Sequence, residues 1–516
     1  MSTVNRRSPS KIKRIWELAK IAANLKKEGK KIVLCHGVFD LVHPGHIRHF
    51  SSAKKYGDVL IVTLTSDKFV NKGPGRPIFR QELRGEVLSS LSQVDYVAIV
   101  DSDSAIEPIK RIKPDFYVKG PDYKKRKPVV NLRRKLQDEE KAVSSIGGKL
   151  IFTEDEIIFS SSKLINEHLS VYPTKTENYL SKLKQKYSVE TIFEMLSTLC
   201  KLKVLIIGDA IIDQYHYCVS LGKSTKEPVM VNKYVNEETF IGGTLATANH
   251  CASLSDNITL VSMLGEKNSF RQLVARRLKD SVKSHLFLQD NIHTIVKRRY
   301  VDAFTKQKLF QIAYLTREVL DKKIEKKILA FLKDNIASFD AVIVNDFGHG
   351  LMSEPMIRLI CRQAKYLALN VQANSANYGF NIVTKYPRAD FVCIDEQEIR
   401  LATHEKLSDV YILIKKIYKR MRCQTILVTK GQYGAIGYQK ETGFVEAPSL
   451  TERIVDRVGA GDAFYAITSV CMVGKLPLDL IAFLGNVAAS IKIAVVGNKK
   501  QIEYSEMVKF VTRLLK

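Results

Sequence analysis

Two short segments combine residue types and spacing suited to chemistry on phosphate groups. The segment HPGH (residues 43–46) follows an apolar run at residues 32–35 and opens a helical pattern. The segment GAGD (residues 459–462) opens a second, strongly apolar helical pattern. The start of a helix presents free N–H groups and a positive dipole potential, and both favour a bound phosphate. The sequence therefore predicts two phosphate-binding sites.

In the first segment, His43 and His46 lie three residues apart on the first helical turn, so both imidazoles could reach one triphosphate. They could donate hydrogen bonds to the charge that develops at phosphorus during in-line attack. Gly45 allows a close approach of the backbone. Two alternatives stay open: a histidine pair that binds a metal, for which the sequence offers no evident third ligand, and a surface loop.

In the second segment, the small residues Gly459, Ala460 and Gly461 could form a nest of N–H groups that binds an anion. Asp462 could then accept the proton of an attacking hydroxyl while the amides hold the phosphoryl group. The alternative is an acidic residue that only caps a helix, and for Asp462 alone this interpretation has at least equal weight.

The elements that must position these residues alternate along the whole chain. In the first half, strands are expected at residues 32–35, 59–64, 96–100, 116–118 and 150–152, with helical patterns between them, and a second alternating pattern starts at residues 203–208. Such alternation predicts doubly wound α/β sheets, which bind ligands at the carboxyl ends of their strands. We therefore predict two Rossmann-like α/β domains.

The domain boundaries follow from a change in composition. Residues 171–200 are polar and rich in lysine, contain Pro173 and show few strand signals. We interpret them as a linker with some helix between a domain at residues 1–170 and a domain at residues 201–516.

The chain of 516 residues has 81 Lys and Arg against 54 Asp and Glu, a formal net charge of +27. This excess favours nucleoside triphosphates and sugar phosphates as partners. Nucleic acid is not expected because zinc-finger spacing and aromatic-glycine RNA motifs are absent from the sequence. The charge also allows a different hypothesis, a non-enzymatic protein that binds polyanions or membrane surfaces. Eight scattered cysteines, the lack of an apolar leader and the lack of a membrane-spanning run predict a cytoplasmic protein.

The segment GVFDLVHPGH (residues 37–46) resembles the signature of the cytidylyltransferase-like nucleotidyltransferases. The likeness continues in order through KGPGRP (residues 72–77), VKGPDY (residues 118–123) and FSSSK (residues 159–163). Lys163 stands where many members of that family have arginine, so it supplies charge without a bidentate fork. The order and spacing most resemble the adenylyltransferase half of the bifunctional heptose kinase/adenylyltransferases of ADP-heptose synthesis.

This resemblance implies that a sugar-phosphate oxygen attacks the α-phosphorus of a nucleoside triphosphate and that pyrophosphate leaves. His43, His46 and Lys119 would be the catalytic residues, and Mg²⁺ or another divalent cation would lie on the pyrophosphate side. The choice between ATP and CTP stays open, although the resemblance favours ATP. The nucleotide- and phosphate-binding residues implied are Gly37, Phe39, Lys72, Arg76, Ser160, Ser161, Ser162 and Lys163.

The GAGD segment, followed by Ala463 and Phe464, resembles the signature of the ribokinase-like (PfkB) sugar kinases, which have a small β lid. The resemblance implies a catalytic Asp462 and ATP as the phosphoryl donor. Glu398 lies in DEQE (residues 395–398), which matches the family's magnesium-associated NxxE motif with Asp in place of Asn. Sugar-binding residues implied are Asp209, Asp213, Gly242, Gly243 and Asp346, and nucleotide- or phosphate-binding residues are Thr429, Gly431, Gly434, Gly459, Ala460 and Gly461.

The kinase half departs from the family pattern on its sugar side. Ala246 replaces an asparagine that contacts substrate, His349 replaces a basic residue, and NVQANS (residues 370–375) replaces an Asp-Pro-Lys stretch. Two interpretations follow: a kinase with a changed sugar pocket, or a domain that binds its ligand but phosphorylates poorly.

The two resemblances together predict a bifunctional enzyme of nucleotide-sugar synthesis. One half phosphorylates a heptose-like sugar with ATP, and the other transfers a nucleotidyl group to a sugar 1-phosphate. The transferase precedes the kinase, the reverse of the common arrangement. The alternative is an active cytidylyl- or adenylyltransferase for a small phosphate ester, with the kinase-like half as a regulatory binding module. A homodimer is one option for the oligomeric state.

Overall fold

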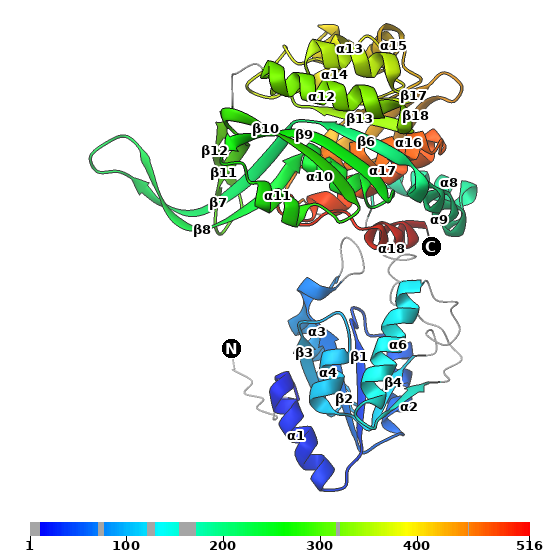
Figure 1. Ribbon diagram of the computed structural model, residues 1–516. Coiled ribbons are helices and arrows are strands. Elements are labelled where there is room, and N and C mark those ends of the chain that lie inside the picture. The colour runs from blue at the N-terminus through cyan, green and yellow to red at the C-terminus, as the bar shows by residue number, and fades with distance from the viewer. Residues whose placement is uncertain are drawn as a thin grey trace. The chain divides into compact units, whose positions relative to one another are not determined.

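The computed structural model contains two compact units, Met1–Val171 and Tyr172–Lys516 (Figure 1). Both are α/β, which confirms the expected fold class. The structure describes residues 11–70, 77–120, 130–153, 172–315, 320–451 and 454–515, without the side chains of residues 130–135.

Unit 1 is built on a parallel five-stranded sheet in the order β3-β2-β1-β4-β5. The order reverses between β1 and β4, so a switch point lies at the carboxyl end of β1, where such sheets bind ligands. The strands are β1 (Ile32–Gly37), β2 (Val59–Thr65), β3 (Tyr96–Val100), β4 (Phe116–Lys119) and β5 (Lys149–Phe152).

Helices cover both faces of this sheet, which explains why its central strands are apolar throughout; every residue of β2 is buried. One face packs Leu18 of α1, Ile109 of α4 and Val143 of α6, and the other packs Phe50 of α2 and Leu88 of α3. The helices are α1 (Ile15–Lys27), α2 (Pro44–Lys54), α3 (Gln81–Ser89), α4 (Ile106–Ile112) and α6 (Val130–Ser144), and η1 (Asp67–Phe69) is a short 3₁₀ turn.

Unit 2 contains a nine-stranded sheet in the order β10-β9-β6-β13-β14-β15-β16-β17-β18. It is parallel from β10 to β16, and β17 and β18 are antiparallel. The strands are β6 (Lys203–Gly208), β9 (Asn257–Lys267), β10 (Val282–His293), β13 (Ala341–Asp346), β14 (Leu367–Val371), β15 (Phe391–Asp395), β16 (Thr425–Thr429), β17 (Ala435–Gln439) and β18 (Gly443–Ala447).

Two groups of helices enclose this sheet (Figure 1). One face carries α10 (Thr244–Cys251), α16 (Ala460–Val473), α17 (Leu478–Ile493) and α18 (Tyr504–Leu515); the other carries α12 (Lys322–Asn335), α13 (Glu354–Gln363), α14 (Glu396–Thr403) and α15 (Val410–Met421). The remaining elements are α11 (Arg271–Arg277) and the 3₁₀ turns η2 (Thr198–Lys201), η3 (Ile336–Ser338), η4 (Val383–Lys385) and η5 (Gly431–Tyr433).

A second sheet of four strands forms the lid that the sequence predicted. Its order is β12-β11-β7-β8, and the long β7–β8 hairpin projects from the rest of the unit (Figure 1). The strands are β7 (Ala210–Lys223), β8 (Met230–Gly243), β11 (Ile295–Asp302) and β12 (Lys308–Tyr314).

The structure corrects the expected linker at residues 171–200, because the helices there belong to unit 2. Within residues 171–200, the chain forms α8 (Thr174–Lys186) and α9 (Val189–Ser197), and Leu183, Ile192 and Leu196 are buried in the core of unit 2. Lysines fill the exposed side of α8, and only a narrow apolar stripe on each helix is buried, so composition alone suggested a linker. Among the described residues, the helices are too short or too polar to cross a bilayer.

Candidate active sites

In unit 1 the two motif histidines lie together at the start of α2, beside the carboxyl end of β1. His43 is the buried N-cap residue, and its Nδ1 accepts the Gly45 N–H at 3.1 Å. The His43 and His46 rings are 4.0 Å apart, and the Phe39 ring meets His46 edge-on at 5.4 Å. The sheet edge and the helix start therefore bring both imidazoles to one point.

Phe39 and Gly37 form the support beneath these rings. Phe39 has a positive φ of 47° and is buried. A Cβ on Gly37 would lie 2.9 Å from the Phe39 ring, so only glycine fits here without displacing the ring. Both residues belong to the expected nucleotide site, and in the structure they shape the turn that carries His43 and His46.

Lys119 ends β4 with its ammonium in a buried environment. It forms an ion pair with Glu139 of α6, and the same carboxylate accepts the Ala105 N–H at 3.2 Å and the Tyr117 hydroxyl at 3.3 Å. The expected phosphate-neutralising lysine thus has a protein counter-ion. The expected residues Lys72, Arg76, Ser160, Ser161, Ser162 and Lys163 lie outside the described residues.

Sequence reasoning missed Arg84 of α3, a fully buried arginine near the switch point. Its guanidinium donates to the carbonyls of Val38 and Thr65, the latter at 3.0 Å, and to the Asp67 carboxylate at 2.6 Å. It ties the loops that leave β1 and β2 to each other. An arginine in an amphipathic helix gives no sequence signal for this function.

In unit 2 the GAGD turn opens α16, with Gly459 as its N-cap residue at φ 80°. The Asp462 carboxylate is buried and accepts hydrogen bonds from Gln372 at 2.8 Å and Asn345 at 3.5 Å. Burial raises the pKa of Asp462, and the two amide donors oppose this shift. A buried carboxylate with a raised pKa is better suited to accept a proton than one exposed to water.

One N–H group of the expected anion nest is engaged within the turn itself. The Ala460 N–H donates to the Arg457 carbonyl at 3.3 Å, so among the described N–H groups of residues 459–462 those of Gly459, Gly461 and Asp462 are the candidates for a bound phosphate.

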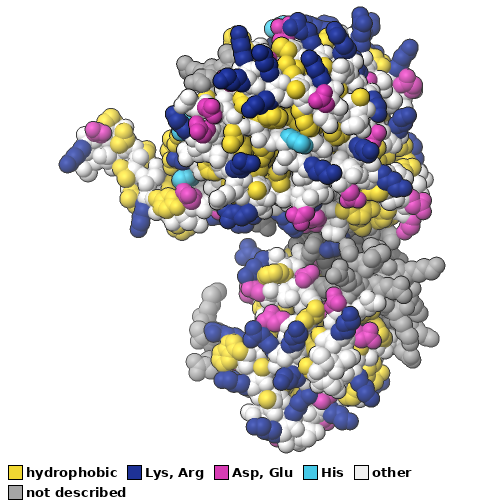
Figure 2. Space-filling view, viewed as in Figure 1, with side chains coloured by type: hydrophobic (Ala, Val, Ile, Leu, Met, Phe, Trp, Pro, Cys, Tyr) yellow, Lys and Arg dark blue, Asp and Glu magenta, His cyan; other side chains and the backbone are white. Residues whose placement is uncertain are grey.

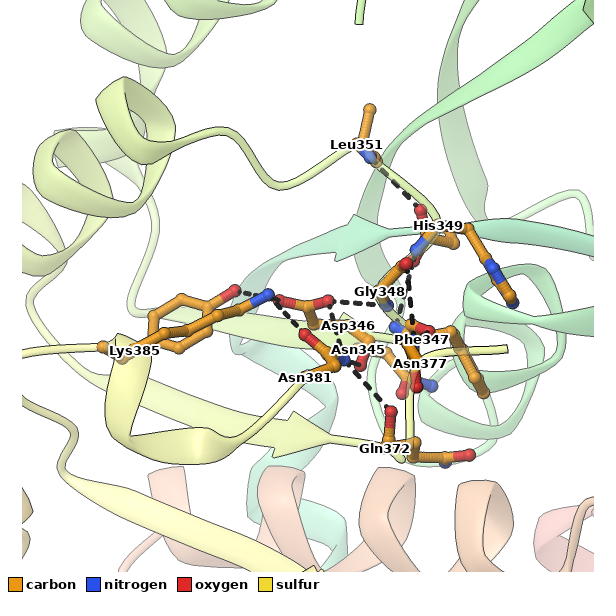
Figure 3. A network of polar contacts seen from close by, with 12 residues as sticks. Asn345, Asp346, Phe347, Gly348, His349, Leu351, Gln372, Asn377, Asn381 and Lys385 are labelled. Atoms are coloured by element: carbon orange, nitrogen blue, oxygen red, sulfur yellow. Dashed lines mark hydrogen bonds and ion pairs between the residues drawn. The ribbon is translucent and has the colours of Figure 1, made fainter. Parts of the chain in front are cut away.

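Two expected sugar ligands, Asp209 and Asp346, also organise the loop after β13. Asp209 accepts the N–H groups of Phe347 at 3.0 Å and His349 at 3.2 Å. Asp346 accepts the Gly348 N–H and the Tyr386 hydroxyl and pairs with Lys385 at 2.6 Å. Figure 3 shows Lys385 and Asn381 pointing toward Asp346. Both carboxylates are buried and engaged with protein groups, and their contact with a sugar stays a prediction.

The other expected sugar-binding residues, Asp213, Gly242 and Gly243, belong to strands of the lid sheet. Asp213 on β7 pairs with Arg299 on β11, and its Oδ2 accepts the Asn498 amide at 3.3 Å. A Cβ on Gly242 would lie 2.2 Å from Asp213 Oδ2, and Gly243 is the N-cap residue of α10 with φ 55°. These glycines allow β8 to pass close to the Asp213 carboxylate before the chain turns into α10.

Lys297 of β11 is a candidate site residue that the sequence did not reveal. Its Nζ lies 5.4 Å from the centre of the Phe347 ring, and burial lowers its pKa while the charges of Asp213, Asp462 and Asp209 oppose this shift. A lone lysine in a short lid strand has no signature, and only the pairing of β11 with β7 brings it here.

The residues expected on the ATP side lie at the end of β16 and in the turn after it. Thr429 ends the strand, and Gly431 and Gly434 have positive φ angles of 56° and 90°. At Gly434 a Cβ would lie 2.0 Å from the Ala447 carbonyl oxygen, so the turn requires glycine.

Glu398 forms a capping box with Asp395 at the start of α14 and also accepts the Ala373 N–H at 3.2 Å. Burial, reinforced by Asp395, raises the pKa of Glu398 to about 8. The described residues contain no cluster of three or more His, Cys, Asp or Glu side chains that could hold a metal by themselves.

The residues that depart from the family pattern on the sugar side, Ala246, His349 and residues 370–375, lie in defined surroundings in the structure. Ala246 is buried in α10, and burial lowers the pKa of His349 to about 4, so this residue is neutral near pH 7. Asn370 donates to the Cys393 carbonyl at 2.7 Å and accepts from Gln372, the residue that also contacts Asp462. The altered stretch therefore supports the candidate base.

Comparisons with known proteins agree with this division. Residues 201–503, more than half of the chain, match the pfkB family carbohydrate kinase model, and residues 34–167 match the cytidylyltransferase-like model.

Among curated proteins, the chain is 45% identical over 144 residues to the bifunctional protein HldE of Aliarcobacter butzleri, covering 28% of this chain and 30% of that protein. It is 26% identical over 313 residues to the bifunctional protein HldE of Trichlorobacter lovleyi, covering 60% of this chain and 62% of that protein. Each match thus spans less than two thirds of the relative's length.

Among solved structures, phosphofructokinase-2 from Escherichia coli in complex with substrates and products superposes with a TM-score of 0.50 at 12% identity, covering 61% of this chain and 100% of that one. This likeness concerns the fold alone. The family model that covers residues 201–503 shows that the chain belongs to the pfkB family of carbohydrate kinases, with a cytidylyltransferase-like domain ahead of the kinase domain.

Proposed function

We propose that the chain is a bifunctional enzyme of nucleotide-sugar synthesis. The observation that carries this proposal is that each unit places its motif at the start of a helix near its parallel sheet, with α2 in unit 1 and α16 in unit 2. Two such helix starts can hold two phosphate-bearing substrates.

In unit 2, the Asp462 carboxylate would accept the proton of a sugar hydroxyl as that oxygen attacks the γ-phosphorus of ATP. Gln372 and Asn345 hold the carboxylate in place, and the N–H groups of Gly461 and Asp462 would bind the transferring phosphoryl group. We propose a heptose-like sugar as substrate, because the kinase half resembles heptose kinases.

In unit 1, a sugar 1-phosphate oxygen would attack the α-phosphorus of a nucleoside triphosphate, ATP by resemblance, and displace pyrophosphate. His43 and His46 would donate hydrogen bonds to the phosphate oxygens as charge develops. The contact of Lys119 with Glu139 gives this lysine a supporting function in addition to any phosphate contact.

We propose that Mg²⁺ accompanies the nucleotide in both units. Glu398 fits a place near such an ion, since burial raises its pKa to about 8 and a nearby cation would stabilise its charged form. Magnesium in phosphoryl transfer is bound largely by phosphate oxygens and water, which agrees with a protein site of few carboxylates.

The test is a mass-spectrometric screen of products from ATP or CTP with sugars and sugar phosphates. We expect Asp462→Asn to abolish sugar phosphorylation and retain nucleotidyl transfer, and His46→Ala to do the reverse. Nucleotidyl transfer with no kinase turnover on a broad sugar panel would instead favour the binding-module alternative, which Ala246 and the engaged Asn370 support. If the protein shows neither activity in this screen, the proposal is refuted.

We also propose that the chain forms a homodimer through its lid sheet. An aromatic stripe crosses all four strands through Phe310, Tyr300, His216 and Tyr234, and Phe310 and Tyr234 are about half exposed. Figure 2 shows further hydrophobic side chains on the β7–β8 hairpin. A second copy offers the same stripe and the same sheet edges, β8 and β12, so a twofold pairing would cover both.

A cytoplasmic location is proposed from cysteine chemistry. The eight cysteines are free, and seven of them are buried. Free thiols persist in a reducing compartment.

A further inference from the structure

A buried lysine lies directly behind the phosphate-binding turn of unit 2. Lys492 is close to the C-terminal end of α17 and is 1% exposed. Its ammonium donates hydrogen bonds to the backbone carbonyls of Val458, at 3.2 Å, and Gly497. Removing a charge from water this completely is costly unless polar partners compensate. The arrangement therefore indicates a specific use of the charge.

Asp456 binds the backbone of the same two residues through their N–H groups. Its carboxylate accepts the N–H groups of Val458 at 3.1 Å and Gly497 at 2.8 Å, and the Tyr215 hydroxyl at 2.6 Å. In residues 458 and 497, the N–H thus meets an anion and the C=O meets a cation. This pair of charges fastens the loop before α16 to the loop after α17.

The lysine also touches the turn that carries the phosphate-binding N–H groups. A Cβ on Gly459, the N-cap residue of α16, would lie 3.0 Å from Lys492 Cε, so the lysine stem packs against that residue. A charge at this depth acts strongly over a few ångströms because little water screens it. The ammonium therefore both shapes the turn and adds positive potential behind it.

We propose that Lys492 is a positioning residue for phosphoryl transfer: its ammonium is a built-in cation that fixes the carbonyls of Val458 and Gly497 and so aims the N–H groups at the start of α16 toward the phosphate. This inference rests on the proposed kinase activity. Because this cation is part of a side chain, the shape of the turn does not depend on ions in solution.

The charge state of Lys492 gives a readout that a packing role alone would not. Burial lowers its pKa to about 8, an effect that Asp456, Asp213 and Asp462 oppose and Lys308 reinforces. His250 faces it from α10, and burial together with the positive charge of Lys492 keeps that imidazole neutral. The ammonium should therefore lose its proton as the pH rises through about 8, and affinity for nucleotide should fall with it.

The experiment compares full-length Lys492→Ala and Lys492→Met with Lys509→Ala, an exposed lysine on α18. Calorimetry measures binding of a non-hydrolysable ATP analogue with Mg²⁺, and a coupled assay measures kcat/KM for ATP. We expect a loss of tenfold or more in kcat/KM for both Lys492 variants and none for Lys509→Ala. Ammonium or methylammonium chloride should restore the alanine variant, whose cavity can admit the ion, but not the methionine variant.

Folded Lys492→Met with wild-type nucleotide affinity and an unchanged pH profile would overturn the inference. If both variants fail to fold, the wild-type profile decides: nucleotide affinity that stays constant from pH 7 to 9.5 would refute it as well. Failure of the kinase proposal is distinguishable, because it appears as wild-type protein that binds the ATP analogue but phosphorylates no sugar. The binding measurements test Lys492 in either case.

Discussion

At the scale of single residues, the buried Lys119–Glu139 ion pair in unit 1 gives a prediction about stability. Lys119→Met would leave the Glu139 carboxylate buried without its counter-ion, so we expect a loss of about 3–5 kcal/mol in the free energy of unfolding. Chemical denaturation followed by circular dichroism measures it. The double variant Lys119→Met/Glu139→Gln removes the unpaired charge and keeps an oxygen for the Ala105 N–H, so it should recover most of the loss; a single variant as stable as wild type would contradict the burial argument.

His250 gives unit 2 a pH dependence of stability. Burial lowers the pKa of His250 to about 3, whereas an unfolded histidine titrates near 6.5. The folded state therefore binds fewer protons in this window, and stability that is present above pH 6.5 is lost as the pH falls toward 3, by up to about 1.4 kcal/mol per pH unit.

Urea denaturation at pH 7, 6, 5 and 4 checks this slope. His250→Asn should flatten it, because asparagine does not titrate, while any cost from the hydrogen bond to the Ile502 N–H applies equally at every pH. Identical slopes in wild type and variant would assign the pH dependence to other groups.

The residues that could be predicted are those with local signatures. His43, His46 and Asp462 stand in short motifs at helix starts, and the structure places them there. Lys297, Arg84 and Lys492 could not be found this way, because their surroundings come from segments far apart in the sequence. Asp209 and Asp346 were found, but their neighbours, which the fold supplies, engage both carboxylates.

At the scale of elements, short apolar runs predicted the strands closely; residues 96–100 and 203–208 are strands with those bounds. Buried parallel strands are continuous in their apolar residues and therefore easy to recognise. Some helix was expected at residues 171–200, but the packing of α8 and α9 into the core of unit 2 was not, because only a narrow stripe on each helix is buried. The burial of that stripe, which composition conceals, decides whether the segment belongs to a domain.

This correction gives a prediction for α9. Ile192 is fully buried in the core of unit 2, so Ile192→Ala should lower the free energy of unfolding by about 2–5 kcal/mol. Glu194→Ala, on the exposed side of the same helix, should change it by less than about 0.5 kcal/mol. Thermal and urea unfolding of both variants compare them. If Ile192→Ala and Glu194→Ala are equally stable, residues 189–197 do not contribute to the core and form a linker.

At the scale of the whole molecule, the lid sheet uses its two faces for different purposes. Alternate residues of β7 and β11 point to opposite sides, so Asp213 and Arg299 pair on one face while His216 and Tyr300 belong to the aromatic stripe on the other. A partner that covers the stripe would therefore also hold the strands that carry the site residues. Oligomerisation and substrate binding are then linked through one sheet.

The homodimer follows from this link and can be tested at the stripe. Phe310→Glu places a charge at its exposed end and should convert a dimer to a monomer, since a buried, unpaired carboxylate costs several kcal/mol. Light scattering coupled to size exclusion measures the mass, with Phe380→Glu, an equally apolar and more exposed position, as the matched control. Because the stripe and the site share β7 and β11, the monomer should also bind sugar more weakly while unit 1 keeps its transferase rate. A wild-type chain that remains monomeric at micromolar concentration, or a Phe310→Glu dimer, would refute the twofold arrangement.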